Sequence, residues 1–351
     1  MKRPETGDRI SNYILDARIG CGSFGEVWKA HHHIFEEAVA IKIPTDAQYV
    51  RNLRHEGVAI HGLDHPNIVR AIDLDPYADQ PYLIMEYVDG PSLREILDAH
   101  PQGLGMDASV AILTGVLSAL DAAGQAGIVH RDIKPANILV AGGNDLTGLT
   151  PSRVKVTDFG LGHAVNATAV SIMQSGSLET ETGRGIAGTL VYMSPEQREG
   201  KPLDPRSDLY ACGVVLFEML TGERPAGTDQ PSDVRNGIPP WMDEFFGRLY
   251  TRQDRRLASA AEALAVLRRH LGPPLVPPRV ATGPLRPPPP PLPPRRCPQC
   301  NAQAFAENRF CTRCGASLAA PASACPGCRR PVRPTDQFCI YCGAGLRTRT
   351  G

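Results

Sequence analysis

The sequence predicts an α+β domain that fills most of the chain, followed by two small metal-ligated modules. The first third alternates short β-rich runs with turns, whereas a continuous apolar run at residues 209–217 has the character of a buried helix. Eight of the 10 cysteines lie near the end of the chain as four Cys-x-x-Cys pairs. With 351 residues and 42% hydrophobic content, the chain is large enough for one sizeable core and an appendage.

Composition changes abruptly after Leu271, where a proline-rich segment begins. We assign residues 1–9 to an N-terminal extension, residues 10–271 to the main domain and residues 272–296 to a linker. Because proline removes amide donors, the linker is expected to be extended and to span up to roughly 70 Å. A semi-rigid spacer is the main interpretation, and a ligand for an aromatic polyproline-binding groove is the alternative.

The formal net charge of +0 conceals an asymmetry along the chain. From Pro273 onward there are 11 Arg, no Lys and two acidic residues, which gives +9; subtraction from the 37 basic and 37 acidic residues leaves 26 and 35, or −9, for the rest. Zinc-bound cysteine thiolates would lower the charge of the tail to about +5. Since its arginines are scattered, we expect the tail to bind a protein partner, with nucleic acid as the disfavoured alternative.

The sequence shows no targeting signal. Met1–Arg3 is basic, but the polar run Pro4–Asp8 follows where a secretory signal would have its apolar segment. No stretch is expected to approach the roughly 20 apolar residues that a membrane-spanning helix requires. We therefore expect a cytoplasmic protein without membrane association, in a reducing compartment that favours metal binding by the cysteines over disulfides.

The cysteine pairs form two copies of one small unit. Residues 297–318 recur as residues 325–346, each cysteine returning 28 positions later, and a short basic tail at residues 347–351 follows. Four thiolates per unit suit tetrahedral Zn²⁺ in a closed structural site, with iron as the alternative metal. The sequence therefore predicts a double zinc ribbon with two structural Zn²⁺ sites. The predicted ligands are Cys297, Cys300, Cys311, Cys314, Cys325, Cys328, Cys339 and Cys342.

A glycine-rich hairpin turn, Gly20–Gly25, lies between predicted strands at residues 13–15 and 26–30. The pattern G-x-G-x-x-G alone is weak evidence, because a dinucleotide-binding fold also uses it. Here a valine follows as G-x-G-x-x-G-x-V, and a third predicted strand at residues 38–43 carries Val-Ala-Ile-Lys. That context favours a phosphate-binding hairpin over a turn that opens a helix.

Three further motifs complete a resemblance to a known family. His130–Asn137 reads HRDIKPAN, Asp158–Gly160 reads DFG and Ser194–Glu196 reads SPE, close to A-P-E. Residues 10–271 thus resemble the eukaryotic-like (Hanks-type) Ser/Thr protein kinases of bacteria. The resemblance implies a two-lobed protein kinase fold, with a β-rich N-lobe, a mostly helical C-lobe and ATP bound between them. It also implies the activity of a non-specific serine/threonine protein kinase that acts on protein substrates and on itself.

The same resemblance implies a role for each motif residue. Lys42 would hold the α- and β-phosphates and pair with Glu56, while Asp132 would accept or orient the proton of the substrate hydroxyl. Asn137 and Asp158 would ligate Mg²⁺. The implied catalytic set is Lys42, Glu56, Asp132, Lys134, Asn137 and Asp158. The implied ATP site is Ile19, Gly20, Cys21, Gly22, Ser23, Phe24, Gly25, Val27, Ala40, Lys42, Met85, Glu86, Val88 and Leu139.

Resemblance also indicates how the chain is held together and regulated. Asp208 is expected to anchor the catalytic loop, and Arg256 to pair with Glu196. Autophosphorylation is expected at Thr180 or Thr182, where Arg131 could bind the phosphate. Two alternatives remain: a pseudokinase scaffold that binds nucleotide without transfer, and a zinc-ribbon adaptor that nucleotide binding switches.

Overall fold

The computed structural model describes residues 3–22, 25–46, 49–159 and 190–271, together with residue pairs 295–296, 299–300, 303–304, 323–324 and 331–332. The chain divides into two compact units, Met1–Val276 and Pro277–Gly351. In the second unit, β9 (Arg295–Arg296) pairs antiparallel with β10 (Gln303–Ala304), and β11 (Ser323–Ala324) with β12 (Pro331–Val332). The two hairpins recur at the spacing of the cysteine repeat. Cys300 is described, and the other seven predicted zinc ligands lie outside the described residues.

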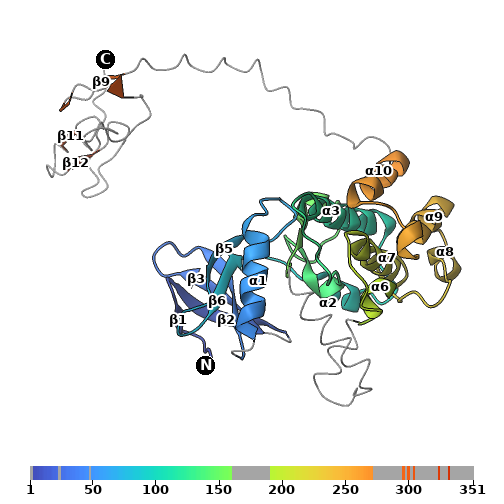
Figure 1. Ribbon diagram of the computed structural model, residues 1–351, viewed down its shortest axis with the longest axis horizontal. Helices are drawn as coiled ribbons and strands as arrows, with labels where there is room; N and C mark the ends of the chain where they lie inside the picture. Colours follow the sequence, from blue (N-terminus) through green and yellow to red (C-terminus); the bar gives the residue numbers. More distant parts are fainter. Residues whose placement is uncertain are drawn as a thin grey trace. The chain divides into compact units, whose positions relative to one another are not determined.

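The N-terminal part of the first unit is one antiparallel sheet of six strands in the order β1-β2-β3-β4-β6-β5. Helix α1 (Val50–His61) packs against β4, β5 and β6, and Figure 1 shows it lying along the sheet. Backbone hydrogen bonds from Gly7 N–H to the Leu15 carbonyl and from Leu15 N–H to the Asp8 carbonyl also join residues 7–8 to this sheet. The strands are β1 (Arg9–Ile10), β2 (Tyr13–Gly22), β3 (Gly25–His32), β4 (Ala38–Pro44), β5 (Ala71–Asp75) and β6 (Tyr82–Glu86).

Strand β4 has a different task on each face. Val39, Ile41 and Ile43 are at most 1% exposed and belong to a hydrophobic cluster with Leu15 and Trp28. Because successive side chains of a strand alternate between its faces, Ala40 and Lys42 lie on the opposite face. The β-branched run therefore packs one side of the sheet and presents Lys42 on the other.

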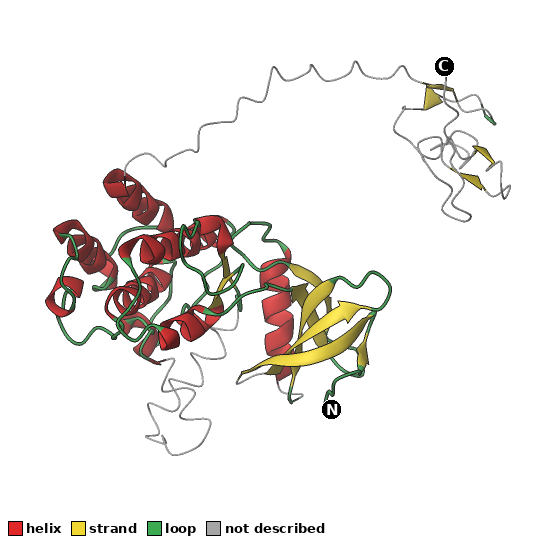
Figure 2. Cartoon of the chain, turned by 180° about the vertical axis from the view of Figure 1, so that it is seen from behind, coloured by secondary structure: helices red, strands yellow, loops and turns green. Residues whose placement is uncertain are grey.

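Helices dominate the rest of the first unit, and Figure 2 shows them gathered beside the strands. Two short strands, β7 (Ile138–Val140) and β8 (Val154–Val156), form a hairpin among them. The predicted α+β, two-lobed architecture is confirmed. The helices are α2 (Leu93–Ala99), α3 (Met106–Gln125), η2 (Pro135–Asn137), η3 (Pro151–Arg153), α6 (Pro195–Arg198), α7 (Arg206–Thr221), α8 (Pro231–Val234), α9 (Pro240–Leu249), η4 (Gln253–Arg255) and α10 (Ala260–Leu271).

Helix α3 corrects one expectation. Within the described residues it is long and apolar enough to cross a membrane: its best window has a mean hydropathy of 1.4. The prediction that no stretch approaches this length was wrong. The physical reason lies in the packing of α3 against α7, α10 and β8, which buries 61% of that window and so requires apolar residues on more than one face.

Helix α7 is buried along almost its whole length, from Ser207 to Thr221. It ends at Gly222, whose φ of 81° is left-handed and whose N–H donates to the carbonyl of Glu218. A Cβ atom built at Gly222 would overlap the backbone carbonyl of Pro101, which precedes α3. Gly222 therefore permits both the helix end and a close backbone approach.

We predict that Gly222→Ala lowers the free energy of unfolding by at least about 2 kcal/mol more than Gly237→Ala does. Both glycines have a left-handed φ, so each substitution brings a similar conformational cost, but a Cβ at Gly237 would meet no atom within 4 Å. Urea denaturation of the two variants measures the difference. Equal losses of stability would show that the contact with Pro101 does not constrain the helix end.

Candidate active site

A cavity of about 520 Å³ lies between the strands of the first lobe and the β7–β8 hairpin. Its apolar lining suits a planar ring, and Glu86–Val88 contributes at its edge. Eight predicted ATP-site residues line it: Ile19, Gly20, Val27, Ala40, Met85, Glu86, Val88 and Leu139. Cys21, Gly22, Gly25 and Lys42 are not among the lining residues, and Ser23 and Phe24 lie outside the described residues.

Sequence reasoning missed part of the lining. Ser92 and Glu95 form a capping box at the start of α2: the Glu95 carboxylate accepts from the Ser92 backbone N–H and hydroxyl at 2.7 and 2.8 Å. The pattern Ser-x-x-Glu could have identified this polar edge. Tyr87 lies in the segment 86–88 that the resemblance assigns to the adenine-binding hinge. The lining residues that were not predicted are Val69, Gly90, Pro91, Ser92, Glu95, Ala136, Thr157 and, as part of this cavity, Asp158.

The Glu86 side chain, at the end of β6, contacts the β7–β8 hairpin. Its carboxylate accepts a hydrogen bond of 2.6 Å from Lys155 on β8 and one of 2.9 Å from the backbone N–H of Arg70. Lys155 lies three residues before Asp158. The Glu86 carboxylate thus joins the edge of the cavity to the hairpin that precedes the DFG motif.

Lys42 is the centre of a buried charge cluster. Its Nζ atom lies 3.0 and 2.8 Å from the two oxygens of Glu56 and 2.9 Å from Oδ1 of Asp158. Lys42 is 6% exposed and Glu56 is 0% exposed, so the predicted pair is formed out of contact with bulk water. The cluster joins β4, α1 and the loop after β8.

The cluster sets the charge of its members. Burial alone would lower the pKa of Lys42, but the Asp158 and Glu56 carboxylates outweigh it and raise that pKa above its usual value. Burial would raise the pKa of Asp158, but Lys42 holds it below its usual value, whereas burial raises the pKa of Glu56 to about 8. Lys42 and Asp158 are therefore both ionised at neutral pH.

Asp132 lies at the centre of the HRDIKPAN segment. Its Oδ2 atom accepts from Lys134 Nζ at 2.8 Å and from Asn137 Nδ2 at 3.1 Å, and Asn137 Nδ2 also donates to the Asp132 carbonyl at 2.8 Å. Because the amide nitrogen of Asn137 is engaged twice, its Oδ1 atom is the one available to a cation. Together with the Asp158 carboxylate, it offers the oxygen ligands that Mg²⁺ prefers.

Hydrogen bonds to α7 hold the backbone of this segment. The buried Asp208 carboxylate accepts from the backbone N–H groups of His130 and Arg131 at 2.8 and 2.7 Å, as predicted for its anchoring role. Arg131 and Asp158 both have a left-handed φ, 69° and 66°, which costs energy in a non-glycine residue. Such conformations persist only where surrounding interactions hold the backbone in place. The hydrogen bonds from the His130 and Arg131 N–H groups to Asp208 are two such interactions.

His130 links the two loops of the site. Its Nε2–H donates to the Thr157 carbonyl at 2.9 Å, since a carbonyl oxygen can only accept. Its ring also contacts that of Phe159, with centroids 4.4 Å apart, and Phe159 is fully buried. The aromatic pair therefore packs the loop that carries Asp158 onto the loop that carries Asp132.

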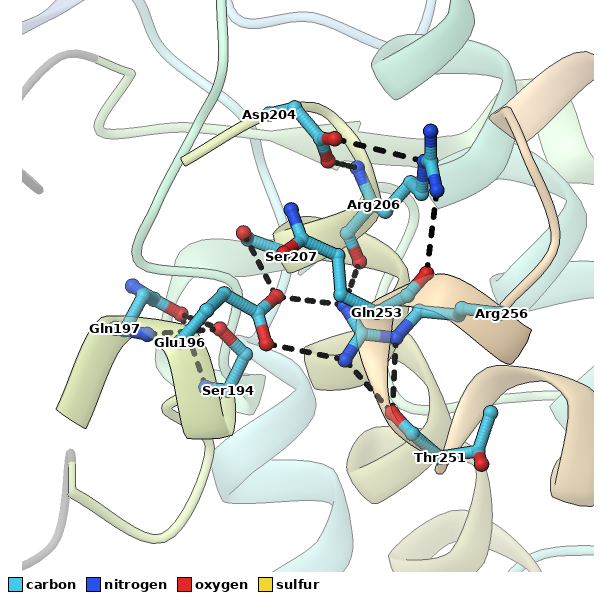
Figure 3. A network of polar contacts seen from close by, with 9 residues as sticks. All are labelled: Ser194, Glu196, Gln197, Asp204, Arg206, Ser207, Thr251, Gln253 and Arg256. Atoms are coloured by element: carbon cyan, nitrogen blue, oxygen red, sulfur yellow. Dashed lines mark hydrogen bonds and ion pairs between the residues drawn. The ribbon is translucent and has the colours of Figure 1, made fainter. Parts of the chain in front are cut away.

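Figure 3 shows the network that holds the SPE segment. Arg256 donates to the two Glu196 oxygens at 2.7 and 3.2 Å, and also to the carbonyls of Arg206 and Thr251. Ser207 donates to the same carboxylate at 2.9 Å. The predicted Glu196–Arg256 pair is confirmed, with side chains 4% and 0% exposed.

The segment also reaches the catalytic loop, because Gln197 Nε2 donates to the Arg131 carbonyl at 2.9 Å. Gly160 and the predicted phosphorylation sites Thr180 and Thr182 lie outside the described residues, within residues 160–189.

We predict that Arg256→Met lowers the free energy of unfolding by about 3–5 kcal/mol, because it leaves Glu196 buried without its cation. Burial alone would raise the pKa of Glu196, but hydrogen bonds from Arg256 hold it below its usual value. The stabilisation is thus present above the unfolded carboxyl pKa and is lost as pH falls, so the effect of the variant should shrink below about pH 4. Guanidinium denaturation at several pH values measures this.

The control is Arg248→Met, which removes the exposed pair between Arg248 and Glu262, 42% and 41% exposed. It should cost less than about 1 kcal/mol. If Arg256→Met and Arg248→Met lowered the free energy of unfolding by similar amounts, the buried Glu196–Arg256 pair would not have the stabilising role assigned to it.

Comparison with known proteins agrees with this geometry. The family described as "Protein kinase domain" matches residues 13–262, and that described as "Double zinc ribbon" matches residues 297–343. Serine/threonine-protein kinase PrkC of Bacillus subtilis is 38% identical over 229 residues, which cover 62% of this chain and 32% of PrkC. PknL of Mycobacterium tuberculosis is 35% identical over 255 residues, which cover 67% of this chain and 59% of PknL.

A solved structure is similar as well. The kinase domain of Mycobacterium tuberculosis PknI superposes with a TM-score of 0.58 at 25% identity, covering 76% of this chain and 99% of that one. The matched part spans only 32% of PrkC and 59% of PknL. The chain belongs to the protein kinase family, and its kinase domain is followed by a double zinc ribbon.

Proposed function

We propose that this chain is an ATP-dependent protein kinase that transfers the γ-phosphate to Ser or Thr hydroxyls of proteins and of itself. One observation supports this proposal most strongly. Lys42 Nζ lies within 3.0 Å of carboxylate oxygens of both Glu56 and Asp158, and Asp158 lines the cavity. A scaffold without catalysis has no need to pair these charges and to retain Asp132 and Asn137. The relatives PrkC and PknL are named serine/threonine-protein kinases.

Each residue of the site has a physical role in this proposal. The cavity lining would hold adenine, and the Lys42 ammonium, kept charged by its neighbours, would bind phosphate oxygens. Magnesium, held by Asp158 and Asn137, would neutralise charge on the phosphates. Asp132 would orient the acceptor hydroxyl and accept its proton. Lys134, 2.8 Å from Asp132, would hold that carboxylate in place and add positive charge beside the transferred group.

The same proposal covers the division of the chain into domains and several features that lie outside the described residues. Residues 10–271 would form the catalytic domain, residues 297–318 and 325–346 the two ribbons, and residues 272–296 the linker between them. Autophosphorylation would occur at Thr180 or Thr182, and the protein would act in the cytoplasm. Each ribbon would hold one structural Zn²⁺, and the pair would bind a protein partner.

We predict that Lys42→Met and Asp158→Asn each lower phosphate transfer by at least about 100-fold. Each change removes charge required at the phosphates or the metal. Transfer from radiolabelled ATP to a generic protein acceptor measures the effect, and circular dichroism checks the fold. The control is Lys201→Met, since the Lys201 side chain is 63% exposed and lies outside the site. Near-parental activity of either site variant would overturn the proposed roles.

For the tail, we predict close to two zinc ions per chain, because each ribbon has its own complete set of four thiolates. Replacing Cys311 and Cys314 with serine should remove one zinc and leave the second bound. Elemental analysis of the purified chain gives the count. One metal per parental chain, or iron in place of zinc, would contradict the two-site proposal.

A further inference from the structure

The proposed mechanism does not use one buried acidic residue of the glycine-rich hairpin. Glu26 follows Gly25 on β3 and is 4% exposed. Because side chains alternate between the faces of a strand, Glu26 lies on the opposite face of the sheet from Val27, which lines the nucleotide cavity. A buried carboxylate requires compensating hydrogen bonds, so the partners of Glu26 show what its side chain holds together.

The Glu26 carboxylate accepts one hydrogen bond from each strand of the hairpin. Oε1 accepts from Arg18 Nη1 on β2 at 3.0 Å, and Oε2 accepts from Trp28 Nε1 on β3 at 3.1 Å. Arg3 lies 3.9 Å from Oε1, but its side chain is 82% exposed and adds little. Trp28 is buried in the hydrophobic cluster on this face of the sheet. The carboxylate therefore links Arg18 to a side chain that core packing already holds.

The pairing of β2 with β3 is interrupted beside these residues. Arg18 pairs with Trp28, and the next pair toward the turn is Gly20 with Val27, so the residue between Arg18 and Gly20 has no partner opposite it. Such a bulge bends the strand that carries it and increases the local twist. We call the end of β2 beyond Arg18, residues 19–22, the β2 arm. The backbone ladder alone fixes the direction of this arm less firmly than a regular ladder would.

Within the described sheet, the β2 arm has little other support. Strand β1 pairs with β2 only at residues 13–14, before the arm begins. The β3 side of the turn is packed more closely, since a Cβ atom at Gly25 would lie 2.5 Å from the Ile43 carbonyl oxygen of β4. Ile19 and Gly20 of the arm line the nucleotide cavity. The less supported strand of the hairpin is thus the one whose end borders the nucleotide.

The contact between Arg18 and Glu26 spans the bulge. Arg18 lies before the β2 arm, whereas Glu26 pairs through its backbone with Cys21 of the arm. The backbone of Glu26 is therefore in register with the arm, while its side chain is bonded at the base of the hairpin. A shift of the arm relative to Trp28 would break one of the two hydrogen bonds and leave a buried carboxylate oxygen without its donor, which is unfavourable.

Resting on the proposed function, we propose that Glu26 is a positioning residue for the nucleotide. Through Arg18 and Trp28, its carboxylate holds the β2 arm in the conformation that places Gly20 and Gly22 beside the phosphates of ATP. Glu26 itself lies on the other face of the hairpin and does not touch the nucleotide. Its effect is therefore on the affinity for ATP and not on the transfer step.

The first test measures phosphate transfer by the full chain, with Mg²⁺ and a saturating protein acceptor, as a function of ATP concentration. Arg18→Ala and Glu26→Ala should each raise KM for ATP roughly 5- to 10-fold and leave kcat at saturating ATP within about 2-fold of the parent. Glu26→Gln keeps an acceptor oxygen for one of the two donors and should cause a smaller rise. The double variant should have a KM no higher than that of Glu26→Ala, because both changes remove the same contact.

The matched control is Glu37→Ala, which removes an exposed glutamate of the turn between β3 and β4 and should leave KM for ATP unchanged. Thermal unfolding identifies any variant that does not fold. The Arg18 side chain is 46% exposed, so Arg18→Ala is expected to fold and tests the proposal even if Glu26→Ala does not.

A second test measures binding without catalysis. Titration calorimetry of the parent and Arg18→Ala with ATP and Mg²⁺, and separately with adenosine, gives the two dissociation constants. The constant for ATP should rise by the same factor as KM, whereas that for adenosine should change by less than about 2-fold, because adenosine lacks the phosphates that the arm encloses.

The contrary outcomes are distinguishable. An unchanged KM for ATP in both alanine variants, or equal weakening of ATP and adenosine binding, would overturn the positioning role while the kinase activity stands. A lower kcat with an unchanged KM would overturn it as well, since Glu26 would then support only the fold. If the parental chain transfers no phosphate, the proposed function fails, and the titration with ATP still decides the role of Glu26.

Discussion

The buried ammonium of Lys42 is the interaction on which the active site depends. It is held by Glu56 of α1 and by Asp158 after β8, so one positive charge joins a strand, a helix and a loop. A buried charge is stabilised by each of its partners, so moving α1 away from the sheet would cost the Lys42 ammonium its two contacts with Glu56 and leave Asp158 as its remaining carboxylate partner. The same Lys42 ammonium thus helps to hold α1 against the sheet, through Glu56, and keeps Asp158 ionised.

Helix α7 supplies the second constraint, and it acts at both of its ends. Near its beginning, Asp208 fixes the backbone of the catalytic loop, and Ser207 supports the Glu196–Arg256 pair. Near its end, the Glu218 carboxylate pairs with Arg94 and Arg224 and accepts a hydrogen bond from the Tyr192 hydroxyl. Because α7 is buried along almost its whole length, close packing holds both of these polar contact sites in fixed positions on one helix.

The sequence predicted those parts of the site whose residues belong to recognisable family motifs, including contacts between distant motifs such as Glu196–Arg256. Asp132, Lys134 and Asn137 fall within the eight residues of the HRDIKPAN motif, and the resemblance to the kinase family assigns their roles. Glu56 was identified through the resemblance to known kinases, from its spacing to the segment Asp64–Val69. Sequence reasoning did not find Lys155, which meets Glu86 only because the fold brings together residues 69 positions apart. The length and apolar character of helix α3 were misjudged for a related reason. Its apolar faces pack against α7, α10 and β8, and these contacts cannot be read from the sequence.

If Lys42 and Glu56 act as one unit, a double-mutant cycle on phosphate transfer will show it. Rates are measured for the parent, Lys42→Met, Glu56→Gln and the double variant with one protein acceptor. Because Glu56 would act through Lys42, the double variant should be no slower than Lys42→Met alone. If Glu56→Gln slowed the Lys42→Met chain by the same factor as it slows the parent, the two residues would act independently, which would contradict the role of Glu56 as the residue that positions Lys42.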